Sequence, residues 1–123
     1  MVKKLGMYSI GYNKVNITLR DGDGGDFCIH PEKLTEITVS IDYVHFHHVI
    51  EVLLHEALEY ILFMNNARFT PGHNMAEDTG AFVFIFDHHK FSECCAAAAE
   101  FIVHITPTVE KEWKRYHKKK EKK

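Results

Sequence analysis

The spacing of hydrophobic residues changes once along the chain, near Tyr43, and this change limits the possible folds. Before it, apolar and polar residues alternate in segments 15–19 and 36–41, as in strands that are buried on one face. After it, apolar residues recur every three or four positions, which is typical of amphipathic helices. Strands followed by helices predict an α+β fold, in which a small N-terminal antiparallel or mixed sheet packs on one long helix followed by two or three more.

The segment between the first strands is rich in glycine and aspartate. Met7–Arg20 as a whole has the β-branched and aromatic composition of strands, and Phe27–Ile29 has the character of a further short strand. Asp21–Asp26 lies between them, and its spacing faintly resembles the start of a calcium loop. The glutamate that would close such a loop is missing. We therefore expect a hairpin or connecting loop with glycines at positive φ.

The first helix is expected to run from about Tyr43 to Met64. Asp42 is a suitable N-cap, and Asn65 and Asn66 are suitable residues for its end. Proline interrupts helices, so Pro107 is expected to separate two of them. After a loop at Thr70–Gly72, the expected helices are 74–86, 91–105 and a short charged one that follows Pro107.

Length and composition favour one domain. A chain of 123 residues that is 46% hydrophobic can form a single core, and we expect residues 1–117 to form it, followed by a polybasic tail at 118–123. We expect no signal peptide and no membrane segment, because no apolar run reaches the ~18 residues that a bilayer requires. Three cysteines, two of them adjacent, do not make a disulfide framework, which favours the cytoplasm.

The centre of the long helix has the residue types and spacing of a metal site. Residues four apart lie on the same face of a helix, so His55 and Glu59 can hold one ion between them. Zinc accepts imidazole nitrogen and carboxylate oxygen at about 2.0–2.2 Å. Glu56 lies about 100° round the helix from His55, where its carboxylate can act as general base toward a water on the metal. The other interpretation is a partly exposed helix face with ordinary charges.

The same residues resemble a known family. A strand that ends in Ile37-Thr-Val-Ser-Ile41, a short linker and a helix with Val52-Leu-Leu-His-Glu-Ala-Leu-Glu59 is similar to the minimal zincin-like (gluzincin-type) metallopeptidases of phages and mobile elements. Some of these have glutamate in place of the second histidine. The resemblance spans roughly residues 36–102. It implies zinc bound by His55 and Glu59, Glu56 as general base, an edge strand that binds an extended peptide, and a third ligand from a later helix.

The third zinc ligand is expected to be Glu93. The small residues that follow it would let its helix pack closely on the first, and the resemblance implies an acidic ligand from such a position. His89 is the next candidate, since it lies four residues before Glu93, and Glu77 is a third. For each of them, an ordinary exposed side chain remains the alternative.

The remaining histidines and cysteines have simpler interpretations. His45 and His47 are expected to be polar residues near a helix end. His48 lies two turns from His55, so a substrate-binding role would suit it better than ligation. Cys94 and Cys95 point about 100° apart on a helix and are expected to pack, not to share an ion.

These observations predict a zinc-dependent metallopeptidase that acts on a peptide or protein. The alternative is a catalytically degenerate zincin-like fold that binds proteins. A di-metal helical bundle is discounted because the chain lacks paired Glu-x-x-His motifs. Nucleic-acid binding through residues 109–116 and the tail is possible chemically, but Trp113 and Tyr116 can equally pack the last helix on the core, and we do not expect it.

Overall fold

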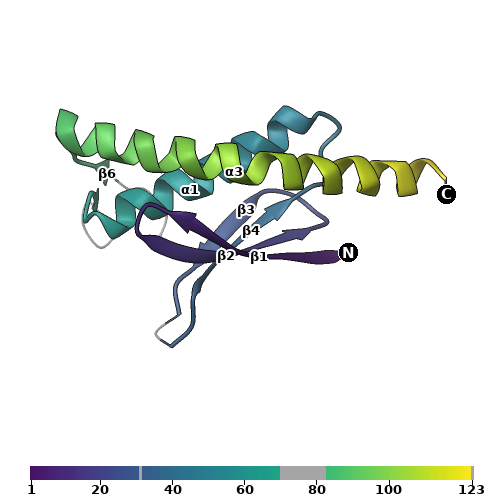
Figure 1. The fold of residues 1–123 in the computed structure, drawn as a ribbon, viewed down its shortest axis with the longest axis horizontal. Helices are drawn as coiled ribbons and strands as arrows, with labels where there is room; N and C mark the ends of the chain where they lie inside the picture. The colour runs from purple at the N-terminus through teal and green to yellow at the C-terminus, as the bar shows by residue number, and fades with distance from the viewer. Residues whose placement is uncertain (31, 70–82, 123) are drawn as a thin grey trace.

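The computed structural model describes residues 1–30, 32–69 and 83–122, and it confirms the α+β fold (Figure 1). Four strands come first and the two helices of the described residues follow the last of them. A separate pair of short strands lies between the helices in sequence. The elements are β1 (Val2–Ile10), β2 (Asn13–Arg20), β3 (Gly25–Cys28), β4 (Thr35–Ser40), α1 (Phe46–Met64), β5 (Arg68–Phe69), β6 (Val83–Phe84) and α3 (His88–Glu121).

The four-stranded sheet is mixed, with the order β1-β2-β4-β3. β1 and β2 form an antiparallel hairpin, β2 and β4 are parallel, and β3 is antiparallel to β4. β3 is therefore an edge strand that runs opposite to its neighbour. Gly22 and Gly24, in the loop before it, have positive φ as expected. Both helices cover the same face of this sheet (Figure 1).

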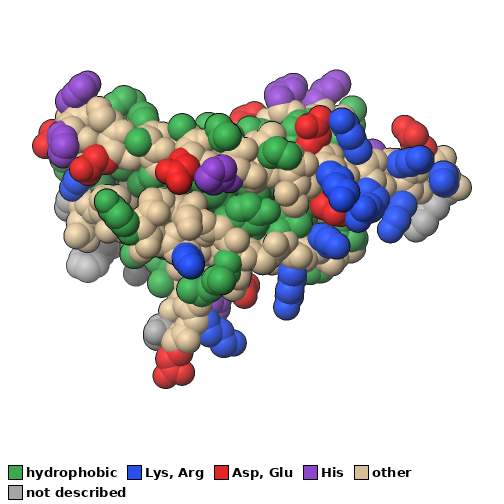
Figure 2. Space-filling view, viewed as in Figure 1, with side chains coloured by type: hydrophobic (Ala, Val, Ile, Leu, Met, Phe, Trp, Pro, Cys, Tyr) green, Lys and Arg blue, Asp and Glu red, His purple; other side chains and the backbone are tan. Residues whose placement is uncertain are grey.

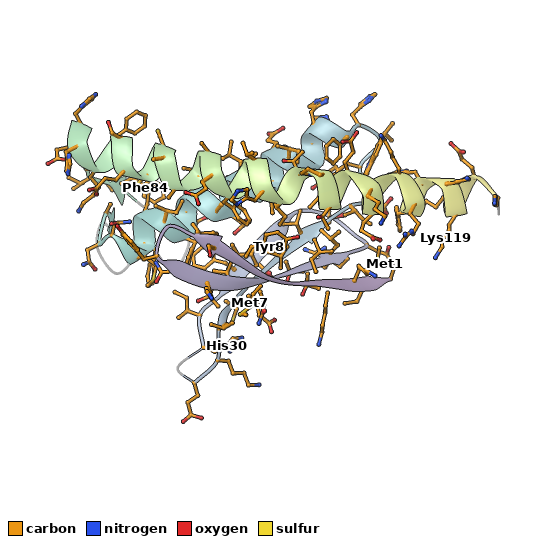
Figure 3. All side chains as sticks on the ribbon, in the orientation of Figure 1. Met1, Met7, Tyr8, His30, Phe84 and Lys119 are labelled. Carbon is orange, nitrogen blue, oxygen red and sulfur yellow. The ribbon has the colours of Figure 1, made fainter. Side chains whose placement is uncertain are left out.

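The core lies between the sheet and the two helices, and the alternation of the strands decides which residues enter it. Tyr8 points from β1 toward α3, where its ring meets that of Phe101 edge-on at 6.4 Å, whereas the neighbouring Met7 is exposed (Figure 3). The fully buried apolar residues of the inner strands and of both helices are Val15, Ile17, Leu19, Ile37, Val39, Val49, Leu53, Ala57, Phe101, Ile105 and Val109.

α1 begins later than the sequence predicted, and Asp42 as its N-cap is wrong. The N-cap is His45, which makes no capping hydrogen bond through its side chain. Two contacts with α3 hold the preceding residues outside the helix. Trp113 donates its indole N–H to the carbonyl of Tyr43 at 2.8 Å, and the Asp42 carboxylate accepts a hydrogen bond from Lys120. The C-cap is Asn65, as expected.

α3 is one helix where the sequence predicted two, so the expected break at Pro107 is wrong. Proline removes one backbone hydrogen bond and costs about 3 kcal/mol within a helix. Here Pro107 is on the exposed side, while Ile105 and Val109 on either side of it are fully buried. Packing of one continuous apolar stripe against the core therefore offsets the cost of the proline.

Two other expectations concern the segments at either end of α3. Of the expected helix at 74–86, residues 74–82 lie outside the described residues, and Val83–Phe84 form β6 instead. At the other end, Lys118, Lys119 and Lys120 belong to the last turn of α3, so the basic tail continues the helix. Lys and Arg side chains gather along this half of α3 (Figure 2). Among the described residues, no helix has the length and apolar character needed to cross a membrane.

Candidate metal centre

His55 and Glu59 face each other across one turn of α1. His55 Nε2 lies 3.3 Å from Glu59 Oε2, and the exposed fractions of their side chains are 69% and 20%. Ligands at about 2.0–2.1 Å from a tetrahedral zinc ion are separated from each other by roughly 3.3–3.4 Å. The pair thus already has the separation that two ligands of one ion require. The same distance also suits a simple ion pair. The surrounding groups are therefore needed to distinguish a pair of metal ligands from an ion pair.

Glu56 is held in the interface between α1 and β3, and it is only 7% exposed. β3 approaches the helix closely at Gly25. A Cβ atom at that position would lie 2.8 Å from Val52 Cγ1, 2.8 Å from the Thr38 carbonyl oxygen and 3.3 Å from Glu56 Cγ. Only glycine lets the strand lie this close to the helix, and the backbone of β3 therefore covers the aliphatic part of Glu56.

The electrostatic environment disfavours the charged form of Glu56. Burial raises the pKa of its carboxyl above the ordinary 4.5, and the negative charges of Glu59 and Asp26 raise that pKa further. His55 acts in the opposite direction. A buried carboxylate beside a second carboxylate gains from any cation, since the cation reduces both the desolvation penalty and the repulsion.

The three residues together form a group that could hold a metal ion. One ligand atom from each of His55, Glu56 and Glu59 lies within 4.8 Å of the others. One imidazole and two carboxylates are a donor set that zinc accepts, and the carboxylates also suit harder divalent ions. The structure thus brings together the three residues that the sequence singled out on this helix.

Glu93, the expected third ligand, is not brought to this group. It faces His89 on its own helix, with His89 Nε2 3.1 Å from Glu93 Oε1. Glu93 also lines a pocket of about 580 Å³ that includes Ile61 at the end of α1. Ile61 lies about 160° round α1 from Glu59, so α3 packs on the other flank of the helix.

The other candidates that the structure describes are also away from the group. His89 pairs with Glu93, and Glu77 lies outside the described residues. His48 pairs instead with Glu51, at 3.3 Å. Cys94 is buried and Cys95 exposed, in line with two side chains that diverge, and burial raises the pKa of the Cys94 thiol.

Sequence reasoning missed the contribution of β3. Gly25 and Asp26 were assigned to a connecting loop, yet Gly25 sets the distance between strand and helix, and Asp26 adds negative charge near Glu56. The signal available was the Gly24-Gly25 pair directly before an apolar run, since glycine within a strand often marks a close backbone approach.

A comparison of the chain with protein-family models, with curated proteins and with solved structures finds no match in any of the three. The resemblance to zincin-like metallopeptidases therefore remains a prediction that rests on the residues of the chain itself.

Proposed function

We propose that this protein is a zinc-dependent hydrolase of peptide bonds, with His55 and Glu59 as zinc ligands and Glu56 as general base. The observation that carries the proposal is the 3.3 Å separation of His55 Nε2 and Glu59 Oε2, with a carboxylate oxygen of the buried Glu56 within 4.8 Å. When bound, zinc lowers the pKa of a coordinated water to about 7.

Glu56 suits the role of base for two reasons. Its carboxylate is next to the ligand pair but starts about 100° round the helix, where it can take a proton without occupying the same position as His55. In addition, it is fixed by packing under β3, so it need not be ordered when a substrate binds. A positioned general base typically contributes a factor of about 10²–10⁴ to the rate.

A peptide substrate is supported by the edge strand beside the site. β3 pairs with β4 on one side, and its other edge has no strand partner within the described parts of the chain. An extended peptide can add to such an edge through main-chain hydrogen bonds. Because Gly25 of β3 lies directly over Glu56, a peptide on this edge would run close to the group.

Metal content tests the first half of the proposal. We expect about one zinc per chain by elemental mass spectrometry of protein purified without a histidine tag, and a loss of binding in both His55→Ala and Glu59→Ala. The matched controls are His89→Ala and Glu93→Ala, which break a pair with the same spacing on α3 and should leave the zinc content unchanged. Wild-type protein that binds no zinc, even after its addition, would overturn the site.

A second function is favoured by one observation. Glu56 is the third donor of the group, and if it serves as a ligand, no base remains beside the ion. The protein would then bind a partner at the edge of β3 without hydrolysing it. Glu56→Gln separates the two cases. If Glu56 is the base, the variant keeps zinc and hydrolyses a peptide library about 10²–10⁴-fold more slowly. If Glu56 is a ligand, the variant loses zinc itself.

A further inference from the structure

Three histidines lie in contact at the start of α1, outside the proposed catalytic group. The ring centroids of His47 and His48 are 4.1 Å apart, and those of His45 lie 5.8 Å and 6.2 Å from them. All three side chains are exposed. Figure 2 shows histidine side chains that project together from the upper edge of the molecule, in the region where α1 begins.

We propose that His45, His47 and His48 form a second metal site, which takes an imidazole-preferring divalent ion such as Cu²⁺ or Ni²⁺. Three imidazoles on one ion, with metal–nitrogen distances of about 2.1 Å, place their ring centroids roughly 4.5–5.3 Å apart. The observed separations of 4.1–6.2 Å lie on both sides of this interval. None of the three separations lies within it, so rotation about the side-chain torsions of these exposed residues has to change the spacing of the rings and turn their nitrogens toward a common point.

Glu51 supplies a second, independent observation. Its Oε2 lies 3.3 Å from His48 Nδ1, one turn further along the helix. Histidines that bind metals usually direct their other ring nitrogen at a carboxylate or carbonyl, which fixes the tautomer and the ring orientation. With Nδ1 of His48 facing Glu51, the Nε2 atom is the one directed toward an ion.

The donor set decides the kind of ion. Nitrogen ligands bind the later divalent metals in the order Co²⁺ < Ni²⁺ < Cu²⁺ > Zn²⁺, and carboxylates give relatively more affinity for harder ions. The partial positive charge at the N-terminus of α1 opposes any cation here, but it amounts to about half a charge and is partly offset by Glu51. Three metal–nitrogen bonds outweigh it most clearly for Cu²⁺.

This site is separate from the group at His55. His48 and His55 are seven residues apart on the same flank of α1, which corresponds to about 10.5 Å along the helix axis. One ion cannot bridge that distance. The second site is therefore independent of the proposed hydrolase, and metal binding at each site can be measured after the ligands of the other have been substituted.

The test is a Cu²⁺ titration of the full chain without a histidine tag, in a His55→Ala/Glu59→Ala background. We expect one tight equivalent whose electron paramagnetic resonance spectrum shows three equatorial nitrogens. Combined His45→Gln, His47→Gln and His48→Gln should remove that equivalent, because the three substitutions take away all three ligands. Glu51→Gln alone should weaken it by about 10–100-fold, since it removes only the group that orients His48.

The matched control is His88→Gln/His89→Gln, which removes two neighbouring histidines from the start of the other helix and should leave the affinity unchanged. Far-ultraviolet circular dichroism checks that the exposed substitutions leave the fold intact. Equal Cu²⁺ affinity in the triple variant and its parent, or fewer than three nitrogens in the spectrum of the parent, would overturn the proposal.

Discussion

The two helices each carry a histidine–glutamate pair with four-residue spacing. Among the residues that the structure describes, only the pair in α1 belongs to a group that could hold an ion. His55–Glu59 and His89–Glu93 have nearly the same separation, 3.3 Å and 3.1 Å. They differ in the residue that follows the histidine. In α1 it is the buried Glu56, whereas in α3 it is Lys90, whose ammonium group donates to the carbonyl of Asn65.

The pairs in α1 and α3 also differ in burial. The Glu59 side chain is 20% exposed and that of Glu93 is 60% exposed. Within the described parts of the chain, no strand covers the α3 pair in the way that β3 covers Glu56. A spacing that suits two ligands is common on helix surfaces. What distinguishes the pair in α1 is a second carboxylate, that of Glu56, which packing holds next to the pair in a place where its charge is poorly solvated.

The largest effect is expected from a substitution that separates β3 from α1. Gly25→Ala places a Cβ atom 2.8 Å from both the Thr38 carbonyl oxygen and Val52 Cγ1, so strand or helix must move. We expect a loss of about 1–3 kcal/mol in the free energy of unfolding, measured by urea denaturation, together with weaker zinc binding. Gly6→Ala is the control, because a Cβ there meets nothing within 4 Å. It should weaken stability through its positive φ and leave zinc affinity unchanged.

The importance of burial can be tested by adding a carboxylate beside the His89–Glu93 pair on α3. Lys90→Glu, in a His55→Ala background, places the same three residue types at the same spacing on α3. We expect the zinc affinity at this position to remain about 10–100-fold below that of the wild-type pair on α1, because no strand of the described residues covers and orients the new carboxylate as β3 does Glu56. Calorimetric titration with zinc measures both. Equal affinities would mean that spacing alone makes the site.

The burial of Glu56 predicts a dependence of stability on pH. Since the folded-state pKa is raised above the ordinary 4.5, the folded protein holds this proton more tightly than the unfolded chain does. The associated stability is fully present below pH 4.5 and is lost as pH rises through the folded-state value. In metal-free protein, Glu56→Gln should therefore stabilise the fold at neutral pH, with an advantage that disappears toward pH 4.

The test is whether Glu56→Gln raises or lowers the stability of the metal-free protein at neutral pH. Thermal unfolding in the presence of a chelator, followed from pH 4 to pH 8, measures it. Glu93→Gln serves as the exposed counterpart and should be neutral across the same range. Destabilisation by Glu56→Gln at neutral pH would show that the ionised carboxylate has a partner in the fold and is not an unfavourable charge.

The smallest effect is expected from the α3 pair itself. Exposed ion pairs with this spacing contribute about 0.3–0.5 kcal/mol. His89→Ala and Glu93→Ala, alone or together, should each change the free energy of unfolding by no more than about 0.5 kcal/mol in urea denaturation. A larger loss would assign this pair a structural role that its exposure does not suggest.

Much of the fold was predictable because it depends on local pattern. Alternation predicted the strands at 15–19 and 36–41, and the end of α1 at Asn65 followed from its residue type. Two local rules failed, and both failed where distant residues intervene. Asp42 does not cap α1 because it accepts a hydrogen bond from Lys120, and Pro107 does not end α3 because the residues on either side of it are buried.

The sequence by itself determined the class of fold and the joint position of His55 and Glu59, since both follow from the period of a strand or a helix. Tertiary structure alone decided that Glu56 is buried beside them and that Glu93 does not reach them. Glu56 is buried because a glycine lets β3 lie against α1, whereas Glu93 does not reach them because α3 packs on the other flank. Helical period is a property of neighbouring residues, but the flank on which a second helix packs depends on how all the apolar faces fit together.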